Sequence, residues 1–274
     1  MPWDGPDARI AIDDPRLCIE PEHGLVETDW YQALDAQSRA RFGAEWMAQL
    51  LKYAIGFEAV LSRGLLQMAQ NAPNRNAEYR YIMHEVVEEG RHSMMFQELI
   101  NRMDADPRPV GPVDRFFDDR IATMGRHFPE FFFFAVLGGE IFIDHQNREL
   151  LRRPTAEVHP LVRRVVQIHV TEEARHVCFA ERYLREHLPH IGVAKRALLR
   201  VLVPVILSEA ARLMLIPPRR LVKGFSIPSR ALRQAFGPGS AQRQKLVDTV
   251  EPVRALCEEH DLWWRPAWRL RQLA

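Results

Sequence analysis

The feature that most constrains this chain is a Glu-x-x-His motif that occurs twice. One copy runs from Glu89 to His92, and the other runs from Glu173 to His176. Residues three positions apart lie on one face of an α-helix, so each copy presents a carboxylate and an imidazole side by side. Mixed carboxylate and imidazole ligands suit iron or manganese. The repeat therefore predicts two helices that each offer a pair of metal-ligand side chains.

A lone glutamate precedes each copy at a nearly equal distance. Glu58 lies 31 residues before Glu89, and Glu140 lies 33 residues before Glu173. One glutamate from each of two helices, with a Glu-x-x-His motif from each of two others, is the ligand arrangement of ferritin-like di-metal bundles. The sequence therefore predicts an all-α fold, a ferritin-like up-and-down helix bundle with extra C-terminal helices.

Glu140 lies in an apolar segment that begins with four consecutive phenylalanines at 131–134. A helix that is apolar all round is buried, and a lone carboxylate there is costly unless it is protonated or binds a cation. The four glutamates of the set carry four negative charges, which two Fe(II) ions would neutralise. Two iron ions are therefore the expected cofactor, and manganese or a mixed iron–manganese pair fits the same ligands.

His169 lies four residues before Glu173 and shares its helical face. Taken alone, it is equally consistent with a metal ligand and with a buried, hydrogen-bonded histidine. The corresponding residue of the first copy is Glu85, which we interpret as a supporting or solvated group rather than a ligand.

Charged residues flank both motifs in the same order. A ligating imidazole usually donates its other N–H to a carboxylate. We therefore expect each flanking glutamate to lie beside the histidine of the other helix: Glu172 near His92 and Glu88 near His176. Two arginines are expected to balance these carboxylates: Arg91 and Arg175.

Proline and glycine positions divide the chain into three parts. Residues 1–34 are predicted to form an extended N-terminal arm, residues 35–190 the helix bundle, and residues 191–274 two or three further helices packed on the bundle within one domain. Within the bundle, helices are expected at about 36–71, 77–103, 113–127, 129–152 and 160–187, with Asp35 as the first N-cap.

Composition excludes several classes of function. The formal net charge of +1 gives no electrostatic basis for binding nucleic acid. The segment from Leu198 to Ile216 is interrupted by charged residues, which argues against a membrane span. Three scattered cysteines and the lack of a signal pattern at the N-terminus favour a reducing compartment, the cytoplasm.

With these residues in place, the chain resembles the p-aminobenzoate N-oxygenase family of diiron enzymes, the AurF type, over roughly residues 40–190. The specific mark is His-x-x-x-Glu-x-x-His in the last bundle helix, here His169, Glu173 and His176. The resemblance implies that His169 is a seventh ligand. It also implies that the reduced diiron site activates O₂ through a peroxo intermediate and oxidises a small organic substrate, an arylamine nitrogen in known members, with electrons from an external donor.

Two alternatives stay open at this point. One is another ferritin-like diiron oxidase, such as a hydroxylase or an acyl-chain desaturase. A radical-storing subunit of ribonucleotide reductase is disfavoured, because the position one turn after each motif histidine is Phe96 or Ala180 rather than tyrosine. The other alternative is a non-enzymatic iron-binding protein, which would assemble into cages, whereas a monomer or homodimer would favour an enzyme.

Overall fold

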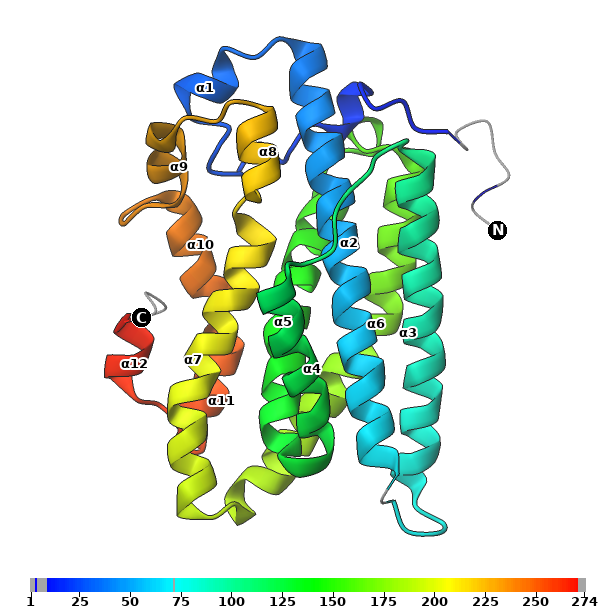
Figure 1. Ribbon diagram of the computed structural model, residues 1–274, viewed down its shortest axis with the longest axis vertical. Coiled ribbons are helices and arrows are strands. Elements are labelled where there is room, and N and C mark those ends of the chain that lie inside the picture. The colour runs from blue at the N-terminus through cyan, green and yellow to red at the C-terminus, as the bar shows by residue number, and fades with distance from the viewer. Residues whose placement is uncertain (1–2, 4–8, 71, 271–274) are drawn as a thin grey trace.

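The computed structural model describes residues 3, 9–70 and 72–270, and its regular elements are helices throughout (Figure 1). The all-α prediction is therefore confirmed. In chain order the elements are η1 (Pro15–Leu17), α1 (Asp29–Gln32), α2 (Ala36–Ala69), α3 (Ala77–Arg102), α4 (Pro112–His127), α5 (Pro129–Arg152), η2 (Thr155–Glu157), α6 (Pro160–His187), η3 (Leu188–His190), α7 (Val193–Leu215), α8 (Arg219–Gly224), α9 (Ser229–Phe236), α10 (Ala241–Thr249), α11 (Glu251–Glu259) and α12 (Arg265–Leu270).

Four long helices, α2, α3, α5 and α6, form the bundle, and their ends follow local capping chemistry. Asp35 caps α2 by accepting a 2.6 Å hydrogen bond from the backbone N–H of Ser38. Pro129 and Pro160 occupy the first turns of α5 and α6, where a missing N–H costs nothing. Helix α2 packs on α3, α5 packs on α6, and α3 contacts α6. The up-and-down arrangement follows from these two antiparallel pairs (Figure 1).

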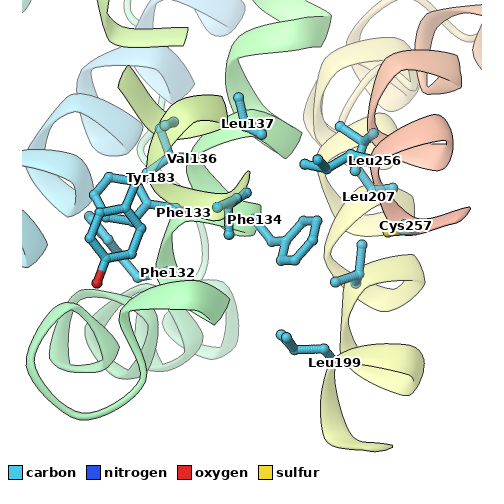
Figure 2. Close-up of a cluster of buried hydrophobic side chains, with 14 of the residues drawn as sticks. Phe132, Phe133, Phe134, Val136, Leu137, Tyr183, Leu199, Leu207, Leu256 and Cys257 are labelled. Carbon is cyan, nitrogen blue, oxygen red and sulfur yellow. The ribbon is translucent and has the colours of Figure 1, made fainter. Parts of the chain in front are cut away.

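The tail differs from the sequence expectation of two or three helices. It contains one long helix, α7, followed by the five short helices α8 to α12. Helix α7 packs on α5, and Figure 2 shows Phe134 extending toward the α7 side chains Leu199 and Leu207, whereas Phe133 lies beside Tyr183. The phenylalanine run is thus shared between the bundle and the tail. None of the helices in the described part of the chain is long and apolar enough to cross a membrane.

The arm is more compact than an extended segment. Between residues 9 and 34 it contains η1 and α1, and its side chains Leu17, Leu25 and Tyr31 are buried. Leu25 and Tyr31 share a hydrophobic cluster with residues of α2, α8 and α9. We propose that arm, bundle and tail form one domain, with divisions near 34 and 190. Residues 1–2 and 4–8 of the arm and 271–274 of the tail lie outside the described residues.

The arm approaches α2 so closely that one position requires glycine. A Cβ atom at Gly43 would overlap the backbone carbonyl of Leu17. We expect Gly43→Ala to displace this part of the arm and to destabilise the protein by about 1–3 kcal/mol, the usual cost of overpacking. Thermal unfolding and limited proteolysis of the arm would measure both effects. The matched control is Gly56→Ala in the same helix, where an added Cβ meets no described atom within 4 Å. This control should stabilise the protein by about 0.5–1 kcal/mol. Equal effects of the two substitutions on stability would contradict the packing argument.

Two apolar clusters fill the bundle, and a polar layer separates them. The phenylalanine cluster lies on one side and includes Leu61, Ile82, Phe133 and Ala180. The arm-side cluster lies on the other side and includes Ala54, Phe96, Leu150 and Val166. On α2, Glu58 falls between Ala54 and Leu61, and the Glu-x-x-His motifs fall at the same level of α3 and α6. The fold therefore brings the ligand-type side chains together across the middle of the bundle.

Candidate metal centre

Seven side chains meet in the polar layer, and each is at most 3 % exposed. They come from all four bundle helices: Glu58 of α2, Glu89 and His92 of α3, Glu140 of α5, and His169, Glu173 and His176 of α6. These are the seven residues predicted as metal ligands. The structure brings them into one buried group; that they bind metal stays a prediction.

Glu89 and Glu173 lie between the two motif histidines. The Oε2 atom of Glu89 is 3.1 Å from Nδ1 of His92, and its Oε1 atom is 2.7 Å from Nδ1 of His176. Glu173 reaches the same two nitrogens, at 3.1 Å from His176 and 3.9 Å from His92. Each carboxylate can therefore offer one oxygen to each side of the group.

The remaining three side chains divide between the two sides. Glu58 Oε1 is 3.8 Å from Nδ1 of His92 and 3.5 Å from Nε2 of His169. Glu140 interacts electrostatically with Glu173, Glu89 and His176. One side of the group thus holds two imidazoles and the other holds one.

The outer nitrogens of the motif histidines contact the expected carboxylates of the opposite helices. Nε2 of His92 is 2.9 Å from Oε2 of Glu172, and Nε2 of His176 is 3.1 Å from Oε2 of Glu88. Donation of each Nε2–H to its carboxylate leaves the Nδ1 lone pair facing the group. Arg175 balances Glu88 through a 2.7 Å contact, whereas Arg91 is exposed on α3.

Two further residues contact the histidines: Glu85, for which the sequence left a supporting and a solvated role open, and Asn147, which the sequence did not single out. Glu85 is 4 % exposed, and its Oε2 atom lies 2.6 Å from Nε2 of His176. The side-chain amide nitrogen of Asn147, Nδ2, lies 3.2 Å from Nδ1 of His169. Only the opposite amide orientation, with Oδ1 accepting an Nδ1–H, leaves the Nε2 lone pair of His169 free to bind a metal. The signal for Asn147 was its position, two turns after Glu140. Asp144, by contrast, pairs with Arg148 near the surface.

The family model described as "P-aminobenzoate N-oxygenase AurF" matches residues 1–261. This chain belongs to the AurF family. Two uncharacterized proteins, one from Mycobacterium bovis and one from Mycobacterium tuberculosis, are each 33 % identical over 271 residues, which covers 98 % of this chain and 79 % of theirs. No solved structure is a significant match. Membership of the AurF family confirms the resemblance and indicates an oxygenase of a diiron enzyme family.

The metal ions of an AurF-type enzyme fit the polar atoms of the site. Among the described residues, both carboxylate oxygens of Glu58 and of Glu140 are buried without a hydrogen-bond partner, and so is Nε2 of His169. Buried polar atoms are nearly always satisfied, so orphaned atoms require an explanation. A pair of cations among these atoms would satisfy them all. The donor set, carboxylate oxygen and imidazole nitrogen without thiolate, suits iron or manganese.

The protonation of these side chains in the metal-free protein also supports the fit of metal ions to the site. Burial, followed by the neighbouring carboxylates, raises the pKa of Glu58 and of Glu140 well above the usual range. Burial opposes a charge on His92 and His176, but contacts with Glu89 and Glu173 raise the pKa of both imidazoles. Protons therefore act as counter-cations to the glutamates, and metal ions would replace them.

His169 differs from the other two imidazoles. Burial, followed by repulsion from His92, lowers its pKa to about 3. It is therefore neutral at ordinary pH, which is the form of histidine that binds metals.

Proposed function

We propose that this chain holds two iron ions in the polar layer and uses O₂ to oxidise a small organic substrate. The specific reaction that we propose is N-oxygenation of an arylamine, with electrons from an external donor. The two ions supply the capacity to bind and reduce O₂; manganese or a mixed pair is the alternative occupancy. A cytoplasmic monomer or homodimer is the expected form of the protein.

The side chains have distinct roles in this proposal. Glu89 and Glu173 would hold both ions, because each has one oxygen near each motif histidine. Glu58 and His169 would add ligands on the His92 side, and Glu140 would add one on the His176 side. Glu172 and Glu88 hold the imidazoles in the tautomer that binds metal. The two apolar clusters exclude water from the reacting atoms.

One observation carries the proposal: four carboxylate oxygens, both from Glu58 and both from Glu140, are buried at one level of the bundle without a hydrogen-bond partner among the described residues. A solvated acidic face would leave them exposed, and a purely structural polar network would give them hydrogen bonds. The absence of tyrosine one turn after the motif histidines further supports substrate oxidation over storage of a tyrosyl radical.

The deciding experiment is metal analysis of protein from iron-supplemented cells, followed by reaction of the reduced protein with O₂ and a panel of substrates. We expect two irons per chain and hydroxylamine or nitro products from arylamines. Oxidation of acyl thioesters instead of arylamines would support the desaturase or hydroxylase alternative. A protein without iron, or with one zinc, would overturn the diiron proposal.

A separate prediction concerns the third imidazole. We expect His169→Ala to keep the helical content and to weaken binding of one iron while leaving the other nearly unchanged, because His169 lies on the Glu58 side only. Anaerobic titration with Fe(II) and far-ultraviolet circular dichroism would measure both properties. His84→Ala, at an exposed position of α3, is the matched control. Unchanged affinity for both ions in the His169 variant would show that His169 is not a ligand.

A further inference from the structure

A pocket begins at the polar layer and ends beneath the arm. His169 lies at its inner end, and its walls come from α2, α3, α5 and α6. In each of these helices the residue nearest the candidate ligands lies at most about one turn away: Ala54 before Glu58, Phe96 after His92, and Ile143 after Glu140. The pocket therefore opens onto the site rather than passing beside it.

The depth of the pocket follows from the helices that line it. The α5 lining extends from Ile143 to Arg153, which is about 15 Å at 1.5 Å per residue. The α2 lining extends from Gly43 to Ala54, about 16 Å by the same rise. An extended chain of single bonds advances roughly 1.2 Å per bond, so this depth accommodates about twelve bonds.

The chemistry of the walls changes along the pocket. The middle is apolar, with Trp46, Leu150, Val162 and Val165 among its residues. At the outer end, Cys18 and Glu20 of the arm lie in the same lining as Arg153. The Nε atom of Arg153 is buried and has no hydrogen-bond partner among the described residues. The outer end can therefore donate a hydrogen bond to a bound molecule.

The arm segment lines this outer end as part of the packed fold. The backbone of Leu17 is seated against Gly43, where a side chain would not fit. Leu17 is 1 % exposed and belongs to the arm-side cluster. The length of the pocket is thus set by a fixed contact between the arm and α2.

We infer that the substrate of this chain is an elongated, largely apolar amine about 15 Å long. Its nitrogen lies beside His169, and its other end carries a hydrogen-bond acceptor that reaches Arg153 beneath the arm. The inference rests on the proposed function for the identity of the reacting end. The length and the polarity of the far end rest on the pocket alone.

Calorimetric binding tests the length. Protein as purified, kept under nitrogen so that no turnover occurs, is titrated with 4-alkylanilines that carry tails of one to ten carbons. We expect the dissociation constant to fall about two- to fourfold per methylene, and to stop falling near seven carbons, because the ring already spans about five bonds of the available depth. An affinity that is independent of tail length, or greatest for the shortest tail, would overturn the inference.

Narrowing the apolar middle of the pocket distinguishes the effect of ligand length from that of general hydrophobicity. Val162→Phe should weaken binding of the heptyl compound at least tenfold and leave the methyl compound within twofold; Leu150→Phe is a second variant for the same purpose. Val201→Phe, at a position of α7 that is 43 % exposed and outside the pocket lining, is the control and should change neither. Equal weakening of the short and long ligands by both pocket variants would contradict an elongated binding mode.

Arg153→Gln tests the far end. It should weaken binding of an aniline whose tail ends in a carbonyl group about tenfold more than binding of the matching alkyl compound. Equal weakening of the two compounds would show that Arg153 does not bind an acceptor at the far end of the substrate. These binding measurements also separate this inference from the proposed function. Length-dependent binding without iron would overturn only the function, whereas length-independent binding by an active N-oxygenase would overturn only the inference.

Discussion

Glu140→Met is expected to stabilise the metal-free protein and to destabilise the iron-loaded protein. Glu140 is fully buried, its two carboxylate oxygens have no partner among the described residues, and burial raises its pKa well above the usual range. A buried polar group without a hydrogen-bond partner costs about 1–3 kcal/mol, and an apolar side chain of similar volume removes this cost. With iron bound in the proposed site, the same substitution would remove a ligand, so one iron should be lost and the stabilisation that iron provides should fall.

Without metal, the difference in unfolding free energy between Glu140→Met and the wild-type protein should depend on pH in a definite direction. The unfolded carboxyl ionises near 4.5, and the folded carboxyl ionises at higher pH. The unfolded state therefore releases a proton first, and the metal-free wild-type protein loses stability as the pH rises above about 4.5. The advantage of Glu140→Met should grow between pH 4.5 and 7.5, which urea unfolding with and without iron would measure.

A second buried glutamate of the same helix provides the control. Glu130 is 7 % exposed but pairs with Lys195 at 3.1 Å. Glu130→Met should lower stability by up to about 1 kcal/mol to the same extent with and without iron. If Glu140→Met behaved as Glu130→Met does, Glu140 would be a structural residue and not a ligand.

Glu173→Ala and Glu172→Ala, at adjacent positions, are expected to differ sharply in metal content. Glu173 lies between the two motif histidines, so in the proposed site its removal would take a shared ligand from both ions. We expect bound iron to fall from two per chain toward none. Glu172 contacts the outer nitrogen of His92 and is 32 % exposed in its side chain. Its removal should weaken metal affinity by about 10- to 100-fold, as is usual for a residue that orients a ligand.

Iron per chain after dialysis against graded concentrations of a chelator would measure this difference. The same pair of substitutions in α3, Glu89→Ala and Glu88→Ala, should repeat the pattern, because the contacts of Glu89 and Glu88 mirror those of Glu173 and Glu172. Greater loss of iron in the Glu172 variant than in the Glu173 variant would show that Glu172 is the ligand and that Glu173 is the orienting residue.

The helices of the bundle could be predicted from the sequence because their signals are local. Asp35, Pro129 and Pro160 mark helix starts through their own backbone chemistry, and the structure begins α2, α5 and α6 at those places. The cross-helix pairs of Glu172 with His92 and of Glu88 with His176 could also be predicted, because the repeat has the same spacing in both helices. The assignment of the seven ligands follows from the same repeat and stays a prediction.

The remaining features depend on contacts between distant parts of the chain. The approach of Leu17 to Gly43 joins two backbones, and no periodic pattern records it. The contact of Glu85 with His176 depends on how α3 and α6 are rotated against each other. The short helices α8 to α12 contain only six to nine residues each, too few for a clear period. Two or three helices were therefore expected where residues 191–270 contain six.

The polar layer between the two apolar clusters has a consequence for local stability. In most bundles the middle of the longest helices is the last region to open and has the slowest amide hydrogen exchange. Here the middle carries the mutually repelling carboxylates, and the apolar contacts lie on either side of it. In the metal-free protein, the deeply buried middle of α2, α3, α5 and α6 should therefore open more easily than the apolar turns on either side of it. Bound metal ions would supply stabilising contacts in the middle of the bundle, and the slowest amide hydrogen exchange would then lie there, as in most bundles.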